Sequence, residues 1–281
     1  MISQEIKKEI IRDINKEESL LKYSYLDKGV NSFLEVINSP NYYTFKNEMN
    51  LINKYKNKLQ EGLKENIVIL GVGDGRKAKE LLAGLKIKNL TIIDISSEMI
   101  SLAKENLSIY NPRIINKEFE EIRFENLEDN TTFILLGGTL LNFKDWVSFL
   151  LRIKNGFHNS NIILGVELLE KECNTEEVVN QYNTEAFFKY SFFPLESIGL
   201  TRKHGFVKQI YNHKREAVET WFILDKKEDI KKRIGIKKNV SKALLCMSIK
   251  LKEQEFYEEI KKYDKLLDYK RGNNHIISIG F

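Results

Sequence analysis

The sequence predicts an α/β fold in which parallel strands alternate with helices. An apolar run at residues 67–70 is typical of a buried parallel strand, and the glycine-rich segment 71–75 follows it directly. A helical apolar pattern comes next, and a second strand at 90–93 ends on Asp94. Strands and helices alternate in this way as far as residue 167, so we expect a doubly wound sheet.

Apolar spacing predicts the other elements of this first part of the chain. The expected helices lie at 2–16, at 31–37, from a cap at Thr44 to about residue 59, after Ser96 or Ser97, and after Asn142. The expected strands lie at 113–115, 133–136 and 162–166. Together these elements build the sheet and the helices that cover it.

The alternation changes after Glu167, where a mixed polar and aromatic segment begins. Residues 206–211 and 217–223 alternate like an antiparallel pair of strands. Further along, we expect a strand at 242–251, a helix at 253–267 and a closing strand at 276–281. This second pattern predicts a separate α+β domain, with the end of the chain returning to the first sheet.

Composition favours an enzyme of the cytoplasm without a bound metal. The chain has 281 residues, of which 42% are hydrophobic, enough for a sizeable core. Its net charge of +5 is a mild excess, and acids follow or split the lysine runs, which is typical of solvated faces. Cys173 and Cys246 are far apart and form no metal-ligand spacing. No apolar run approaches the roughly 20 residues of a membrane span, and the N-terminal segment is charged rather than signal-like.

The segment 71–75 has the chemistry of a site for an adenosine-containing cofactor. Glycines let the backbone approach a ligand at a helix N-terminus, and Asp94, at the tip of the next strand, can accept the hydroxyls of a ribose. The spacing is G-x-G-x-G, and Arg76 stands where the dinucleotide fingerprint has its third glycine. A dinucleotide is therefore not the expected ligand.

The run after Asp94 narrows the choice of cofactor. Residues 94–103 have the pattern D-x-S-x-x-M-x-x-x-A, which follows the glycine-rich turn and opens a helix. This conjunction resembles the class I S-adenosylmethionine (SAM)-dependent methyltransferases, whose sheet is Rossmann-like. The resemblance implies that SAM is the cofactor.

Aromatic motifs on both sides of this unit resemble a particular family. The segment 25–44 has the pattern Y-x-D-x-G-x-x-x-F followed by P-x-Y-Y-T, and residues 71–77, 136–143, 165–168 and 182–186 match further motifs in order. Together they resemble the histidine Nα-methyltransferase family of ergothioneine biosynthesis. The resemblance covers nearly the whole chain.

The resemblance implies a role for individual residues. On the cofactor side, the glycine loop would lie along the methionine part of SAM, and Lys77 would bind its carboxylate. Asp94 would bind the ribose, and Glu118 with Phe119 would hold the adenine. The implied cofactor residues are Gly71, Gly73, Gly75, Lys77, Asp94, Glu118 and Phe119. The amino-acid pocket would be lined by Tyr25, Phe33, Tyr42, Asn142 and Tyr182. Among them, Tyr25 and Asn142 would act in catalysis by directing the substrate amine.

Two departures from the family concern the substrate side chain. Where the histidine enzymes have E-x-S, this chain has Cys246-Met247-Ser248, so the serine is kept and the carboxylate is lost. A substrate-facing methionine of the family corresponds to Thr220. A buried imidazole N–H without an acceptor costs about 1–3 kcal/mol. We therefore expect N-methylation of the α-amine of an amino acid or amino-acid-like molecule, with specificity shifted from histidine.

The expected domain division follows from these assignments. Residues 47–172 and 251–281 would form the SAM-binding domain, and residues 1–46 and 173–250 the substrate-binding domain. The partners expected are a small molecule, with neither nucleic acid nor membrane. The sequence leaves the oligomeric state open.

The sequence leaves two other functions open. The pI of about 8.9 is compatible with a nucleic-acid methyltransferase, which would act on RNA. Enzymes that methylate base amines carry the motif [DNS]-P-P-[YFW] after the fourth strand, but residues 137–143, which occupy that position here, lack it. Residues 39–42 are superficially similar to the motif, but they lie before the cofactor loop, where it is not expected. The other alternative is a non-catalytic SAM-binding protein.

Overall fold

The computed structural model describes residues 2–119, 127–157, 159–169, 174–225, 231–232, 234–237, 239–262, 265–271 and 274–280. The chain forms two compact units. The first unit contains Met1–Tyr43 and Asn174–Ile249, and the second contains Thr44–Cys173 and Lys250–Phe281. The assignment of the first unit to the substrate and of the second to the cofactor stays a prediction.

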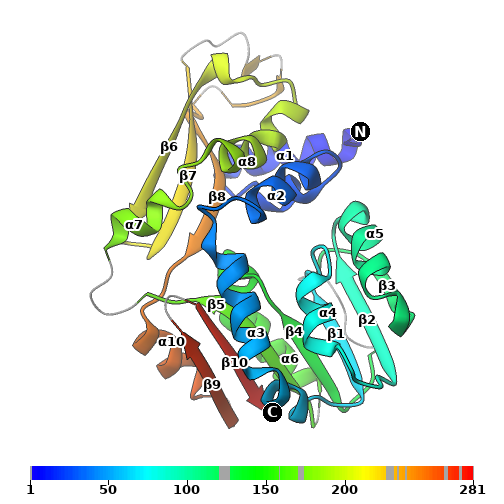
Figure 1. Ribbon diagram of the computed structural model, residues 1–281. Helices are drawn as coiled ribbons and strands as arrows, with labels where there is room; N and C mark the ends of the chain where they lie inside the picture. Colours follow the sequence, from blue (N-terminus) through cyan, green and yellow to red (C-terminus); the bar gives the residue numbers. More distant parts are fainter. Residues whose placement is uncertain are drawn as a thin grey trace. The chain divides into compact units, whose positions relative to one another are not determined.

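The second unit contains a seven-stranded sheet with the order β3-β2-β1-β4-β5-β10-β9 (Figure 1). The first five strands in this order are parallel, whereas β10 is antiparallel to both β5 and β9. Their bounds are β1 Asn66–Leu70, β2 Asn89–Asp94, β3 Arg113–Asn116, β4 Thr131–Leu135, β5 Asn161–Glu167, β9 Lys265–Arg271 and β10 Asn274–Gly280. The predicted doubly wound α/β sheet is confirmed.

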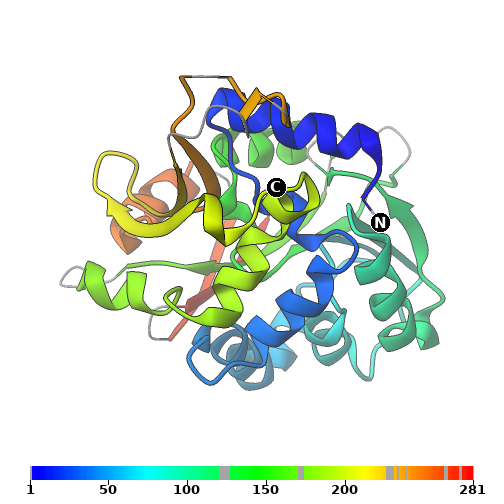
Figure 2. The same cartoon turned by 90° about the horizontal axis from the view of Figure 1, so that it is seen from above.

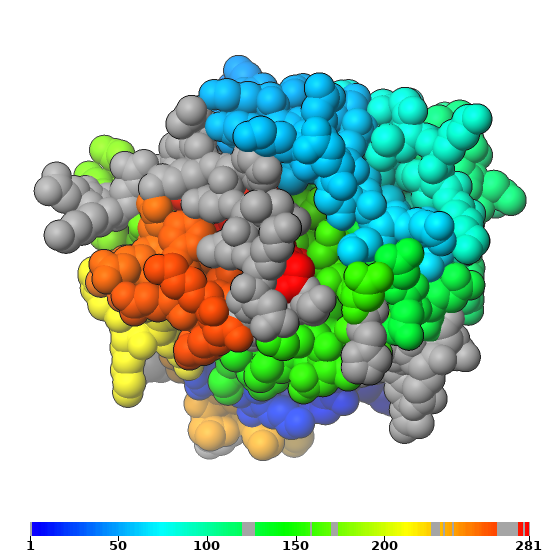
Figure 3. All heavy atoms as spheres, turned by 90° about the horizontal axis from the view of Figure 1, so that it is seen from below, coloured from blue at the N-terminus to red at the C-terminus, as the bar shows by residue number. Residues whose placement is uncertain are grey.

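Helices cover both faces of this sheet. On one face, α3 (Tyr43–Glu61), α4 (Arg76–Leu82) and α5 (Ser97–Asn106) bury their apolar sides against β1, β2 and β4. On the other face, Phe133 of β4 packs against Phe157 at the end of α6 (Trp146–Gly156). The rings of Trp146 and Phe256 stack at 5.4 Å, so α6 contacts α10 (Glu253–Ile260), which lies beside it in the space-filling view (Figure 3).

The first unit combines helices with a three-stranded antiparallel sheet, β6-β7-β8. Helix α2 lies against α8, and a Cβ atom on Gly29 of α2 would come within 2.9 Å of Phe193 (Figures 1 and 2). Phe192 of α8 packs on Phe222 of β7 with ring centroids 4.9 Å apart. The elements are α1 Gln4–Lys16, the 3₁₀ helix η1 Leu21–Tyr25, α2 Gly29–Ile37, α7 Thr175–Asn180, α8 Glu185–Ser197, η6 Arg202–His204, β6 Gly205–Asn212, β7 Ala217–Leu224 and β8 Lys242–Ile249.

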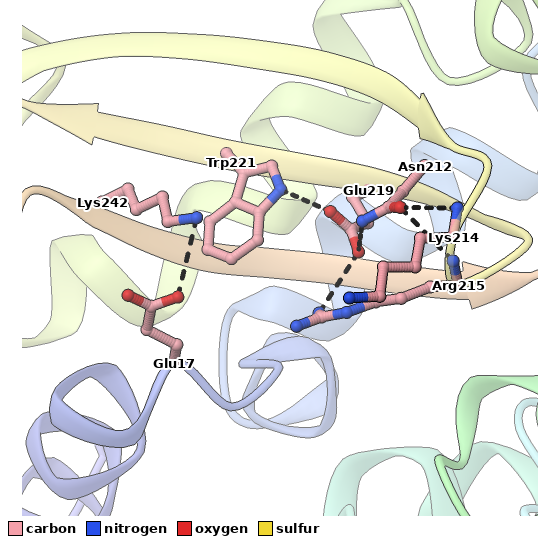
Figure 4. A network of polar contacts seen from close by, with 7 residues as sticks. All are labelled: Glu17, Asn212, Lys214, Arg215, Glu219, Trp221 and Lys242. Carbon is pink, nitrogen blue, oxygen red and sulfur yellow. Dashed lines mark hydrogen bonds and ion pairs between the residues drawn. The ribbon is translucent and has the colours of Figure 1, made fainter.

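A buried carboxylate stabilises the hairpin of the small sheet (Figure 4). Glu219 of β7 is 1% exposed and accepts hydrogen bonds from Trp221 Nε1 at 2.8 Å and Asn212 Nδ2 at 3.0 Å. Arg215 pairs with the same carboxylate at 3.2 Å, and Lys242 lies 3.9 Å from the centroid of the Trp221 ring. These contacts compensate the burial of the charge. Successive side chains of a strand point to opposite faces of the sheet, so Glu219 lies on the face opposite to that of Thr220.

Two predicted elements are wrong in detail. The helix expected at 253–267 ends at Ile260, and residues 265–271 form the edge strand β9 instead, because their backbone pairs with β10. Thr44 does not cap a helix, since α3 begins at Tyr43 and Thr44 lies inside it. A short apolar run cannot distinguish a strand from a helix by its pattern alone. Cys173 lies outside the described residues.

Candidate functional site

The glycine loop makes a tight turn between β1 and α4. Gly71, Gly73 and Gly75 all have positive φ, at +64°, +57° and +81°. A Cβ atom on Gly73 would meet no other atom within 4 Å, so this side of the loop is open to a ligand. A Cβ atom on Gly75 would lie 2.9 Å from Ala103 Cα, so this glycine is required for the packing of α4 against α5. A contact of Gly75 with the cofactor stays a prediction.

Asp94, the last residue of β2, lies directly beside the loop. It is 7% exposed, and its carboxylate accepts hydrogen bonds from Gly73 N at 3.2 Å and Ser96 N at 2.9 Å. Burial raises the pKa of Asp94 to about 6, although these backbone N–H groups act in the opposite direction. The carboxylate is thus held in one orientation at the carboxyl end of the strand, where ligands of α/β sheets bind.

Phe119 forms an apolar wall on the other side of the loop. Its ring is 9% exposed and meets Phe143 at 5.2 Å and Phe149 at 5.7 Å, both edge-on. A Cβ atom on Gly71 would lie 3.3 Å from the Phe119 ring, which brings the ring next to the loop backbone. Glu118, which is partly buried, precedes it. A flat apolar surface beside an open glycine turn suits an adenine ring.

Lys77, in the first turn of α4, forms an ion pair with a residue that the sequence analysis missed. Its ammonium group donates a hydrogen bond to Glu48 of α3, which is 2% exposed. Gly137 N, just beyond β4, donates to both carboxylate oxygens of Glu48, at 2.9 and 3.0 Å. One signal in the sequence could have found Glu48, because it lies three and four residues before Leu51 and Ile52 on the apolar face of a predicted helix.

These residues of the second unit fit SAM. A nucleoside requires acceptors for its ribose hydroxyls and a surface for its base, and Asp94 and Phe119 offer both beside the open position at Gly73. An amino-acid end requires a cation for its carboxylate, and Lys77 offers one after the same loop. The arrangement is compatible with SAM, and the contact of each residue with the cofactor stays a prediction.

Asn142 occupies the end of the 3₁₀ helix η5 (Thr139–Asn142), which follows β4. The side chain that caps α6 belongs to Asp145, which accepts a hydrogen bond from Ser148 N at 3.3 Å. Asn142 is partly exposed, and its amide has no hydrogen-bond partner within the described part of the chain. Helix capping therefore does not account for Asn142.

In the first unit, predicted pocket residues gather around Tyr190 of α8. Tyr25 and Phe33 lie 5.0 Å apart between ring centroids, and each lies 5.5 Å from the Tyr190 ring. The Tyr190 hydroxyl is fully buried, and no hydrogen bond of good geometry reaches it from the described residues. Burial raises the pKa of Tyr190 well above its usual value, and the neighbouring Tyr25, Cys246 and Tyr42 raise it further. Sequence analysis missed Tyr190 because it shares the helical apolar spacing of Phe187 and Pro194.

The remaining predicted pocket residues lie on one face of the small sheet. Thr220 pairs with Cys246 and Val218 with Ser248 across β7 and β8, so the three polar side chains share a face. Gln209 Nε2 donates to Thr220 Oγ1 at 3.4 Å and to the backbone oxygen of Tyr182 at 2.7 Å, which links Tyr182 to this sheet. Tyr182 is 5% exposed and packs edge-on against Phe187.

Comparison with known proteins identifies first the class and then the family. A family model described as histidine-specific methyltransferase, SAM-dependent, matches residues 6–264. This match spans most of the chain, so the chain belongs to that family and is a SAM-dependent methyltransferase. No curated protein matches the chain. In the part of the chain that the structure describes, no helix is long and apolar enough to cross a membrane.

Solved structures of low sequence identity are similar to this chain. The PH0226 protein from Pyrococcus horikoshii OT3 is similar with a TM-score of 0.54 and 15% identity, over 88% of this chain and 97% of that chain. The magnesium protoporphyrin IX methyltransferase (ChlM) from Synechocystis PCC 6803, solved with bound SAH, has a TM-score of 0.49 and 10% identity, over 92% and 97% of the two chains. The first likeness confirms the Rossmann-like α/β fold.

Proposed function

We propose that this enzyme methylates the α-amine of an amino acid or amino-acid-like small molecule and that its specificity is shifted from histidine. The observation that carries the proposal is the packing of Tyr25 and Phe33 against Tyr190, with ring centroids 5.5 Å away in each case, and Tyr42 and Cys246 are near enough to raise the pKa of Tyr190. Tyr25, Phe33, Tyr42 and Cys246 come from separate parts of the first unit, and the family resemblance assigns all four to the substrate side. Their convergence supports a substrate pocket in that unit.

The proposed cofactor residues belong to the second unit. Asp94 would accept the ribose hydroxyls, Phe119 with Glu118 would hold the adenine, and Lys77 would bind the methionine carboxylate. Bound SAM supplies an electrophilic methyl group on a sulfonium. The open side of Gly73 would admit the part of the cofactor that joins its two ends.

Methyl transfer to an amine needs a lone pair directed at the methyl group and little acid–base chemistry. An α-amine with a pKa of about 8 is partly deprotonated near neutral pH. We assign the orientation of that amine to the Tyr25 hydroxyl and the Asn142 amide, and the substrate carboxylate to Tyr42 and Tyr182. Asn142 suits this role because its amide has no partner among the described residues and does not cap α6.

The polar face of the small sheet supports the shift in specificity. Thr220, Cys246 and Ser248 are all uncharged, and the carboxylate of Glu219 lies on the opposite face. A buried imidazole N–H would lack a carboxylate acceptor there, at a cost of about 1–3 kcal/mol. The proposed substrate therefore has a side chain that needs no counter-charge in this pocket.

A mass-spectrometric screen tests the function. The protein is incubated with SAM and a panel of free amino acids and short peptides, and products are sought at one, two or three added methyl groups. Methylation of an amino acid other than histidine is expected. Efficient trimethylation of histidine would contradict the specificity shift, and an absence of methylated products across the panel would refute amino-acid methylation itself.

Two variants test the assigned roles once a substrate is found. Tyr25→Phe and Asn142→Ala are each expected to lower kcat by about 10-fold or more, since they remove hydrogen bonds that aim the amine. Tyr211→Phe, in β6 of the first unit, is the matched control and should retain wild-type turnover. Unchanged turnover in both test variants would overturn the assignment.

A further inference from the structure

Glu48 is a buried carboxylate to which neither the sequence motifs nor the family resemblance gave a role. It lies on α3, and its charge is compensated from two directions, by the Gly137 amide and by the Lys77 ammonium. Such a group is held in one position, because a carboxylate buried without these partners would be strongly unfavourable.

The sheet provides a space shaped for this carboxylate. Gly165 lies in β5, next to β4, and a Cβ atom there would lie 1.6 Å from Glu48 Oε1 and 2.8 Å from its Cδ. Any side chain at residue 165 would therefore displace the carboxylate. Three segments far apart in sequence, α3, the end of β4 and β5, combine to hold Glu48 at the carboxyl end of the parallel strands.

The Lys77 ammonium is fixed by Glu48 but still has donors available. An ammonium group has three N–H donors, and within the described residues Glu48 is the hydrogen-bond partner of Lys77. The Lys77 side chain is 16% exposed, and its nitrogen lies 3.2 Å from where a Cβ atom on Gly137 would be and 5.1 Å from the Phe45 ring centroid. The charge is thus confined beside the glycine loop with donor capacity for a ligand.

We propose that Glu48 is a positioning residue of the cofactor site, which fixes the Lys77 ammonium so that its remaining N–H groups bind the carboxylate at the methionine end of SAM. This inference rests on the proposed role of Lys77. Beyond that role, the position of the ammonium is set by Glu48, Gly137 and Gly165. In this role Glu48 acts through Lys77 and is not itself a ligand of the cofactor.

Two ligands that differ at the amino-acid end separate this role from a general contribution to stability. S-adenosylhomocysteine (SAH) has that end, whereas 5′-methylthioadenosine has the adenosine and the thioether without it. Isothermal titration measures both dissociation constants for the wild type, Glu48→Gln, Lys77→Met and the double variant. Glu80→Gln is the matched control, because Glu80 forms a partly exposed ion pair with Lys56 at 2.9 Å in the same unit.

We expect Lys77→Met and Glu48→Gln each to weaken SAH binding by about 10-fold or more and to change methylthioadenosine binding by less than about 2-fold. The double variant should bind SAH no more weakly than Lys77→Met, since Glu48 acts through Lys77. Glu80→Gln should leave both ligands unchanged.

Other outcomes would refute either the positioning role of Glu48 or the proposed role of Lys77. Equal weakening of both ligands by Glu48→Gln, an additive double variant, or tighter SAH binding by Glu48→Gln would refute the positioning role. If Lys77→Met leaves SAH binding unchanged, the proposed role of Lys77 fails instead. If Glu48→Gln lacks a cooperative thermal transition, Glu48→Asp takes its place, because it keeps the charge on a side chain that is shorter by one methylene. It should weaken SAH selectively, and equal effects on both ligands would again refute the proposal.

Discussion

The buried carboxylate of Asp94 predicts that cofactor binding weakens in mild acid. Asp94 has a pKa of about 6 in the folded protein, because burial disfavours its charged form. If the ribose hydroxyls donate to the ionised carboxylate, only the ionised fraction binds fully. That fraction is about nine-tenths at pH 7 and about one-tenth at pH 5, so SAH affinity should fall by about 10-fold, or roughly 1.4 kcal/mol.

The same pKa has the opposite effect on the stability of the ligand-free protein. A pKa raised from 3.8 to about 6 means that the folded state binds this proton more tightly than the unfolded state. The contribution of Asp94 to stability is therefore fully present below pH 3.8 and is lost as the pH rises through about 6. Weaker binding at pH 5 is thus not a consequence of unfolding caused by this residue.

Isothermal titration of SAH between pH 5 and pH 8 provides the measurement, with thermal unfolding recorded at each pH. Asp94→Asn is the control, since it keeps one acceptor oxygen and cannot ionise. It should bind SAH about 10-fold more weakly at pH 7 and show no dependence on pH with a midpoint near 6. A wild-type affinity that stays constant from pH 8 to pH 5, or a variant that keeps the wild-type pH profile, would refute the reasoning.

Three further substitutions have defined outcomes. Tyr190→Phe removes a buried hydroxyl without a described hydrogen-bond partner, so the melting temperature should stay unchanged or rise, while kcat/KM for the identified amino acid falls by about 5-fold or more. Gly75→Ala places a Cβ atom 2.9 Å from Ala103 at φ +81°, and thermal unfolding should show a loss of about 2 kcal/mol or more. Phe119→Ala should weaken SAH and methylthioadenosine equally, by about 5–10-fold in titration, because both ligands have adenine.

Local sequence was sufficient for the cofactor loop. Gly71, Gly73 and Asp94 lie within one βαβ unit, whose strands, turn and helix are each marked by a pattern in contiguous residues. The parallel pairing of β1 with β2 then brings the ends of these strands together, and the Asp94 carboxylate meets Gly73 N. Motif and geometry agree because the motif contains the whole arrangement.

Patterns in contiguous residues cannot predict contacts between segments that are distant in sequence. Glu48 is separated by 29 residues from Lys77 and by 89 from Gly137, and only the order of strands across the sheet brings them together. Tyr190 carried no functional signal in the sequence for a different reason, since a tyrosine on an apolar helical stripe is typical of core packing. Its burial, with a hydroxyl that finds no hydrogen-bond partner of good geometry among the described residues, becomes visible only once Tyr25 and Phe33 are packed around it.

The pairing of Lys77 with Glu48 also bears on the charge that the cofactor meets. SAM has a sulfonium in addition to its amino-acid end, so it is more positive than SAH by one unit. An unpaired Lys77 would repel that sulfonium, whereas the Lys77–Glu48 pair is neutral. The carboxylate of Asp94, which forms no ion pair with the part of the chain that the structure describes, then remains as a negative charge beside the loop. If Glu48 neutralises Lys77 in this way, Glu48→Gln should lower the affinity for SAM more than that for SAH. The pair would thus favour binding of the methyl donor over retention of its product.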